Sequence, residues 1–212
     1  MTISVIIPVY NAGKTLETGV GSVLGQSRLP DEILLVDDGS EDDSIAAAER
    51  LQSRDSRVRL LRQPHGGASA ARNRGLREAG GEWVLFLDDD DWWMHEYVLQ
   101  EIYDVVAGNF GEVFDMVCFD FIWKGRGYAS VQPGNMNIAV WSKAFKRSLI
   151  GDTRFQAIPF TSDKPFMDEI CKKRPMCYPM NKLMYYYNYM REGSQTEINA
   201  RPDGAVPEAG NI

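Results

Sequence analysis

Aspartates gather in two short runs of this 212-residue chain, and runs of this kind can hold a metal ion and a phosphate group. Asp37 and Asp38 form the first run, and the four residues from Asp88 to Asp91 form the second. Hard cations such as Mg²⁺ and Mn²⁺ bind carboxylate oxygens together with substrate phosphate oxygens. The second run therefore predicts a platform for a metal and a diphosphate, with a solvated turn or a helix N-cap as the alternative.

The segments that must position these acids alternate between strands and helices. Continuous apolar runs predict strands at residues 3–9, 32–36, 58–61, 83–87 and 113–123. Apolar residues at helical spacing predict helices at 16–24, 68–79 and 94–106, and a capping-box pattern at Ser40 and Asp43 predicts another that runs to Leu51. Such an α/β chain favours a largely parallel sheet, whose ligands bind beyond the carboxyl ends of the strands. Both aspartate runs directly follow a strand, so we expect them at one edge of the sheet.

In the second half the pattern loosens, because glycines and prolines mark loops before a helix-like segment at residues 141–150. We expect one domain over residues 1–200, with a nucleotide-binding half at 1–107 and an acceptor-side half at 108–200. Residues 201–212 are rich in Pro and Gly and lack periodicity, which predicts a flexible tail.

Charge and cysteine content limit the function classes. The formal net charge of −7 argues against a nucleic-acid partner, because neutralising phosphates requires a surplus of Lys and Arg. Three cysteines without metal-ligand spacing favour reduced thiols over a disulfide framework or a zinc site. The chain opens directly with a strand and has no apolar run of membrane-spanning length, so we expect a cytoplasmic location.

One stretch, from Lys172 to Arg191, holds five basic residues and no acid. Such a stretch can surround a diphosphate, which we favour, or contact the anionic inner face of a membrane. Within it, Tyr185 to Tyr187 predict a buried strand more than a sugar-stacking platform. The sequence leaves homo-oligomerisation open.

Six segments together resemble the family 2 glycosyltransferases, and they cover about residues 3 to 196: SVIIPVYN, LLVDDGSEDDS, GGASAARNRG, LFLDDDDWW, WSKAFKRSLIGDTRF and YYYNYMREGS. The resemblance implies a GT-A fold, a Rossmann-like and mainly parallel sheet flanked by helices with a smaller acceptor-side region. It also implies an inverting enzyme that uses a nucleotide-sugar donor, most simply a UDP-sugar. The acceptor would be a hydroxyl of a glycan or lipid-linked molecule in bacterial-type polysaccharide synthesis.

The resemblance assigns nucleotide contacts to single residues. Pro8 and Tyr10 match the motif that lines the nucleobase, and Asp38 matches the residue that hydrogen-bonds uracil. Arg72 and Asn73 match a segment that lies beside the nucleotide.

The second aspartate run matches the family's D-x-D motif. In this register Asp88 would lie near the ribose and Asp90 would bind a divalent metal, Mn²⁺ or Mg²⁺. Because four acids are consecutive, Asp89 and Asp91 remain open substitutes for the metal ligand.

Inverting transfer needs a carboxylate that takes the proton of the acceptor hydroxyl. Asp163 matches the family's base, although Ser162 replaces the usual Glu before it, and Asp168 is a competitor. Arg191 and Ser194 match a segment that approaches the diphosphate or the acceptor.

Two other functions are alternatives to this interpretation. The chain could be a non-catalytic nucleotide-sugar or glycan-binding protein, which Ser162 makes conceivable. Sugar-1-phosphate nucleotidyltransfer is disfavoured, because no Gly-rich loop with Arg and Lys follows the first strand. We expect His65 and His95 to be incidental, since they lack ligand spacing, and Trp92 and Trp93 to stack on a sugar or to pack beneath the site.

Overall fold

The computed structural model describes residues 1–108, 113–125, 128–132, 138–158 and 162–188. Its helices are α1 (Leu16–Leu24), α2 (Ser44–Arg54), α3 (Ala68–Glu78), α4 (Val98–Ala107), α5 (Arg147–Ile150) and α6 (Asp163–Lys172). Its strands are β1 (Ile3–Val9), β2 (Glu32–Asp37), β3 (Val58–Arg62), β4 (Trp83–Phe86), β5 (Trp92–Trp93), β6 (Met116–Gly125), β7 (Tyr128–Gln132), β8 (Lys143–Lys146) and β9 (Cys177–Tyr187). A 3-10 turn, η2 (Val140–Ser142), precedes β8.

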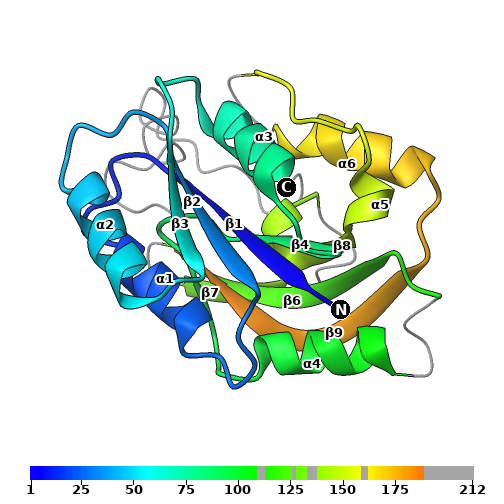
Figure 1. The fold of residues 1–212 in the computed structure, drawn as a ribbon. Coiled ribbons are helices and arrows are strands. Elements are labelled where there is room, and N and C mark those ends of the chain that lie inside the picture. Colours follow the sequence, from blue (N-terminus) through cyan, green and yellow to red (C-terminus); the bar gives the residue numbers. More distant parts are fainter. Residues whose placement is uncertain (109–112, 126–127, 133–137, 159–161, 189–212) are drawn as a thin grey trace.

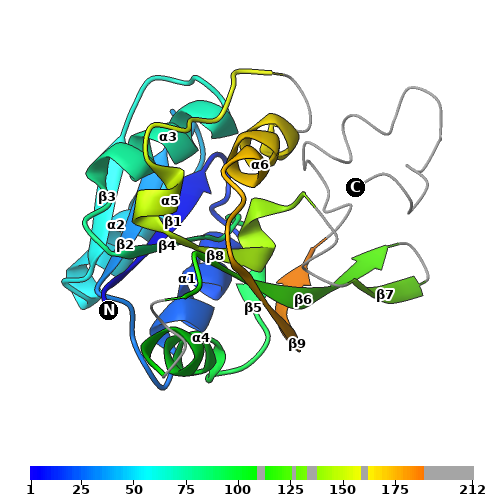
Figure 2. The same ribbon diagram turned by 90° about the vertical axis from the view of Figure 1, so that its right-hand side faces the viewer.

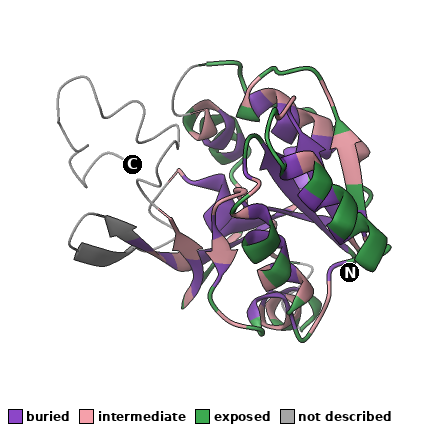
Figure 3. Cartoon of the chain, turned by 90° about the vertical axis from the view of Figure 1, so that its left-hand side faces the viewer, coloured by how far each residue is buried: buried purple, intermediate pink, exposed green. Residues whose placement is uncertain are grey.

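The first four strands form the parallel part of one sheet, in the order β3-β2-β1-β4 (Figure 1). Every residue of β1 and β4 is buried, as expected for apolar strands that are covered on both faces (Figure 3). Figure 2 shows α3, α5 and α6 on one side of the sheet and α1 and α4 on the other. The parallel sheet predicted from the alternating pattern is confirmed.

The remaining strands extend this sheet with mixed directions. Strand β8 pairs antiparallel with β4 on one side and with β6 on the other. Strand β9 then pairs parallel with β6, and the short β5 pairs antiparallel with β9. The C-terminal strand therefore lies beside the segment that carries the second aspartate run.

Three local predictions were wrong. Residues 141–150 form η2, β8 and α5 instead of one helix, because pairing with β4 and β6 outweighs the helical spacing of their apolar residues. Helix α4 begins at Val98, since Trp92 and Trp93 pair with β9. Helix α2 begins at Ser44 without a capping box, and its N-cap makes no side-chain hydrogen bond.

The two aspartate runs meet at the carboxyl edge of the parallel strands, as predicted. Val9 at the end of β1 is in register with Asp37 at the end of β2. The backbone N–H of Tyr10, which follows β1, donates to Asp89 at 2.9 Å. This edge is where a ligand of the sheet would bind. Among the described residues, no helix combines the length and apolar character needed to cross a membrane.

Candidate active site

Asp38 anchors the loop between β3 and α3. Its side chain is 2% exposed and accepts hydrogen bonds from the backbone N–H groups of Gly66 (3.0 Å) and Gly67 (2.7 Å) and from Nε2 of Gln63 (2.7 Å). Gly67 has a positive φ of 84°, a conformation that other residues rarely adopt. Asp38 therefore lies at the predicted nucleobase edge, and its carboxylate shapes the loop that borders this edge.

An exposed ring pair lies beside Asp38. The rings of Tyr10 and His65 are 4.4 Å apart with an interplanar angle of 30°, and Nδ1 of His65 lies 2.9 Å from Oδ2 of Asp38. Tyr10 is 43% exposed, whereas Pro8 is buried within β1. The sequence alone predicts that His65 is incidental. It cannot show that Asp38 holds the β3–α3 loop, and with it His65, beside Tyr10.

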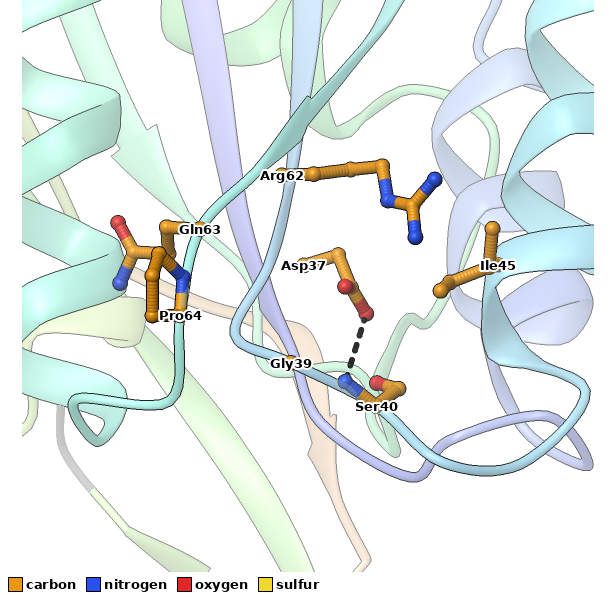
Figure 4. Close-up of a pocket in the computed structure, with 7 residues that line it drawn as sticks. All are labelled: Asp37, Gly39, Ser40, Ile45, Arg62, Gln63 and Pro64. Carbon is orange, nitrogen blue, oxygen red and sulfur yellow. Dashed lines mark hydrogen bonds between the residues drawn. The ribbon is translucent and has the colours of Figure 1, made fainter.

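A separate cavity of about 300 Å³ lies between α2 and the ends of β2 and β3 (Figure 4). Figure 4 shows Asp37, Arg62 and Ile45 directed toward it, and the backbone N–H of Ser40 donates to Asp37 at 3.3 Å. None of the four aspartates from Asp88 to Asp91 lines this cavity. The second aspartate run therefore lies outside this cavity.

The buried Arg72 contacts two of the predicted site residues, Asp88 and Asp163. Nη2 of Arg72, in α3, lies 2.7 Å from Oδ1 of Asp88, and its Nη1 lies 3.3 Å from Oδ1 of Asp163. The Arg72 side chain is 8% exposed. Burial acts to lower the pKa of Arg72, but the charges of Asp88 and Asp163 raise it above its ordinary value. Three segments distant in sequence thus converge on one cation.

Asp163 opens helix α6 and is held at both oxygens. Arg72 contacts Oδ1, and the backbone N–H of Val140 donates to Oδ2 at 3.1 Å. Burial raises the pKa of Asp163, the charge of Arg72 opposes this rise, and Asp88 adds to it. The competitor Asp168 lies on the exposed face of α6, where it pairs with Lys164 at 2.8 Å. Of these two carboxylates, it is Asp163 that contacts Arg72, the residue that also pairs with Asp88.

Asn73 uses its whole side-chain amide to hold another segment. Its Nδ2 donates to the carbonyl oxygen of Phe155 (2.8 Å), and the backbone N–H of Phe155 donates to its Oδ1 (2.9 Å). The ring of Phe155 stacks on Phe166 of α6, with 4.1 Å between ring centroids. Asn73 therefore helps to position the helix that carries Asp163, and its place beside the nucleotide stays a prediction.

The last residue of the second aspartate run belongs to the core. Asp91 is fully buried and accepts hydrogen bonds from the Tyr185 hydroxyl (2.6 Å) and from the Asn188 backbone N–H (2.8 Å). Burial raises the pKa of Asp91 well above its ordinary value, and the charges of Asp90 and Asp88 add to this effect. Gly19 of α1 packs so closely that a Cβ there would lie 2.8 Å from the Asp91 carbonyl oxygen. Asp91 thus has a structural role: its hydrogen bonds in the core anchor the second aspartate run.

Several tyrosine and tryptophan side chains near this run pack against one another. Tyr185 is fully buried, and Trp141 stacks on it with 4.4 Å between ring centroids. Trp92 stacks on Tyr186 at 4.1 Å, and Trp93 is buried. The predicted buried strand at Tyr185 is confirmed.

The basic stretch in the C-terminal part is largely paired within the chain. Lys172 lies against Glu169, Lys173 donates to the carbonyl oxygens of Leu149 and Ile150, and Lys182 pairs with Glu101. These three lysines therefore stabilise helices α4, α5 and α6. Arg191 and Ser194 lie outside the described residues.

The described residues contain no group of three or more His, Cys, Asp or Glu side chains arranged as a metal site. Cys118, Cys171 and Cys177 are free thiols, in agreement with the sequence-based prediction.

The curated relatives are glycosyltransferases. Glycosyltransferase GlyA of Streptococcus pneumoniae is 29% identical to this chain over 223 residues, which cover 92% of this chain and 32% of that protein. The chain therefore spans about a third of the length of this relative.

Two solved structures share the fold. S. aureus TarS in complex with UDP-GlcNAc superposes with a TM-score of 0.78 at 22% identity, over 93% of this chain and 61% of that chain. The mannosyltransferase PcManGT from Pyrobaculum calidifontis, in complex with GDP-Man and Mn²⁺, gives a TM-score of 0.69 at 19% identity, over 97% and 65%. These likenesses confirm the predicted GT-A fold.

The model of glycosyl transferase family 2 matches residues 4–169, which include both aspartate runs and Asp163. The chain therefore belongs to glycosyl transferase family 2.

Proposed function

We propose that this chain is the catalytic domain of an inverting glycosyltransferase that moves a sugar from a nucleotide-diphosphate donor to a hydroxyl group. The observation that carries the proposal is the contact of Arg72 with both Asp88 and Asp163. This contact supports the proposal, because it links the carboxylate that we propose as the base to the acid that we propose to border the donor. The binding of UDP-GlcNAc by TarS and of GDP-Man by PcManGT supports a nucleotide-sugar donor.

The nucleobase would lie against the exposed face of Tyr10, next to His65 and the loop that Asp38 holds. An aromatic face is a suitable platform for a base, because stacking requires only a flat apolar surface. Uracil is the base that we propose, since the resemblance assigns its recognition to Asp38. In the structure Asp38 already accepts three hydrogen bonds from the loop between β3 and α3. We therefore infer that it supports the base mainly by fixing Gly66 and Gly67.

The acidic run fits a divalent cation shared with a diphosphate. Mg²⁺ commonly uses one or two protein carboxylates and completes its shell with phosphate oxygens and water, so a cluster of three protein ligands is not required. We propose Asp90 as the ligand for Mn²⁺ or Mg²⁺. Asp91 is unsuitable, because both of its oxygens accept hydrogen bonds in the core. When bound, the cation would neutralise charge on the departing diphosphate.

Asp163 would act as the general base. As the acceptor oxygen bonds to the anomeric carbon, the bond from that carbon to the diphosphate oxygen breaks, and Asp163 takes the acceptor proton. Burial raises the pKa of Asp163, which strengthens it as a proton acceptor, while the charge of Arg72 opposes this rise. Arg72 also fixes its orientation. Attack opposite to the leaving group inverts the anomeric configuration.

The acceptor, the location and the assembly remain proposals. We propose a hydroxyl of a glycan or a lipid-linked molecule, used in the cytoplasm or at the inner face of the membrane. We also propose peripheral membrane contact, homo-oligomerisation and a division of the domain at residue 107. The tail predicted at residues 201–212 lies outside the described residues.

The test is turnover with a donor panel. We expect UDP release from one of UDP-glucose, UDP-galactose or UDP-GlcNAc in the presence of Mn²⁺ and none after chelation, with GDP-mannose as the comparison donor. Replacing the base (D163N) should lower turnover by about 10³-fold or more and leave UDP affinity within twofold. The matched control is D168N on the exposed face of α6, which should be unaffected. UDP binding without turnover would favour the non-catalytic alternative, and a fully active D163N would place the base elsewhere.

A further inference from the structure

Lys143, the first residue of β8, is a lysine in the protein core. It is 2% exposed and lies opposite Cys118 of β6 in the sheet. Lysine is among the residues least often buried, because taking an ammonium group out of water is costly. Burial lowers the pKa of Lys143 to about 8. The placement of a positive charge here therefore calls for a role.

The ammonium group of Lys143 fastens the turn η2. Its Nζ donates to the carbonyl oxygen of Ala139 at 2.8 Å and lies 3.2 Å from the Ser142 hydroxyl oxygen. The Ser142 hydroxyl in turn donates to the same Ala139 carbonyl at 3.0 Å. The two ends of the turn are thus tied together by one buried cation and one buried hydroxyl.

This turn contains the backbone group that holds Asp163. The Val140 N–H, next to Ala139, donates to Oδ2 of Asp163 at 3.1 Å, while Arg72 contacts the other oxygen. A shift of the turn would therefore change the angle at which the carboxylate faces an acceptor. The charge of Lys143 also acts on this carboxylate, because it opposes the rise in the pKa of Asp163 that burial causes.

We propose that Lys143 is a positioning residue for the general base: it fixes η2, and through the Val140 N–H it fixes the orientation of Asp163. This proposal rests on the proposed role of Asp163 in the transfer reaction.

The first test is the substitution of Lys143 by methionine, which keeps the length of the side chain and removes the ammonium group. A base displaced by about 1 Å can cost on the order of 10²-fold in rate, so kcat of K143M should fall by about 10- to 100-fold. The KM for the UDP-sugar that the donor panel selects should stay within about twofold, because η2 holds the proposed base, whereas the donor is proposed to contact Tyr10 and Asp90.

The pH profile of kcat/KM provides a readout that a purely structural role would not move. Among the described residues, the charged groups that act on Asp163 include Arg72 of α3, Asp88 after β4 and Lys143 of β8. Removing the positive charge of Lys143 raises the pKa of Asp163, so the acidic limb of K143M should move to higher pH. K164M, which removes a lysine next to Asp163 that pairs outward with Asp168, is the matched control and should leave both kcat and this limb unchanged.

Thermal unfolding and UDP binding by calorimetry show whether K143M is folded. If it is not, S142A decides, because it removes the second group that ties the turn and leaves the lysine in place. S142A should lower kcat by about three- to tenfold, the loss expected for one weakened hydrogen bond, with unchanged UDP affinity.

Wild-type kcat in a folded K143M, or in S142A when K143M does not fold, would overturn the proposal. So would a K143M defect confined to the KM of the donor. The two proposals can be refuted separately. A fully active D163N would show that Asp163 is not the base, whereas an inactive D163N together with a fully active K143M would refute only the positioning role.

Discussion

The buried cation Arg72 offers the sharpest test of the site. Substitution by methionine keeps much of the aliphatic stem and removes the guanidinium group that contacts Asp88 and Asp163. Two carboxylates would then face each other in a poorly hydrated region without a positive charge between them. Removing one partner of a buried ion pair costs about 3–5 kcal/mol.

The lower end of this range suits the structure. The side chains of Asp88 and Asp163 are 24% and 15% exposed, so water recovers part of the lost interaction. The contact with Asp163, at 3.3 Å, is also longer than an optimal charged hydrogen bond. We therefore expect R72M to lose about 3 kcal/mol of unfolding free energy. For a domain of this size that corresponds to a fall in Tm of roughly 6–12 °C.

The loss of stability in R72M should depend on pH, and the pKa of Asp163 determines the direction of this dependence. Burial already raises the pKa of Asp163 in the folded state, and the charge of Arg72 opposes that rise. A carboxyl group with a raised folded pKa binds its proton more tightly in the folded state, so its contribution to stability falls as the pH rises through that pKa. Without Arg72 the pKa of Asp163 rises further. The deficit of R72M should therefore be largest near neutral pH and should shrink as the pH is lowered.

Thermal unfolding followed by circular dichroism at pH 7.5 and pH 5 measures both effects. R77M is the matched control, because Arg77 lies on the exposed face of the same helix. A Tm of R72M within 2 °C of that of R77M, or a deficit that is equal at the two pH values, would refute the electrostatic reasoning.

Two further predictions concern the aspartate run. D90A should lose the Mn²⁺-dependent part of its UDP affinity, measured by calorimetry with and without chelator, and an affinity that responds to chelator as in the wild type would contradict the assignment of Asp90. Y185F should lose about 1–3 kcal/mol of unfolding free energy, because Oδ2 of the buried Asp91 loses its hydroxyl donor; Y186F, at a half-buried position, is the control, and equal denaturant midpoints for the two variants would show that the hydroxyl is unimportant.

The fold of residues 1–107 could be predicted from the sequence, because the pattern within each segment agrees with the place of that segment in the sheet. Strands β1, β2 and β4 are mostly apolar, and helices α1 and α3 carry apolar residues at helical spacing. Since parallel strands end at a common edge, the convergence of the two aspartate runs followed from the order of these elements.

Contacts between distant segments account for what could not be predicted. The alternating pattern could not show that Lys143 to Lys146 fill the gap between β4 and β6, because this pairing joins residues 25 or more positions apart along the chain. Four identical aspartates look alike in a sequence, yet the Tyr185 hydroxyl makes Asp91 a core group. Likewise, the contact of His65 with Tyr10 depends on hydrogen bonds that Asp38 makes to backbone groups.

The pairing of β9 with β5 and of the Tyr185 hydroxyl with Asp91 has a consequence for dissection of the enzyme. A fragment that stops at residue 107 would retain every strand of the parallel layer but would leave the flank of β4 unpaired and a carboxyl group in the core without its phenol. Such a fragment should be prone to association through its open strand. The segment that carries the second aspartate run is thus completed by β9, and we expect that residues 1–107 do not form a stable unit on their own.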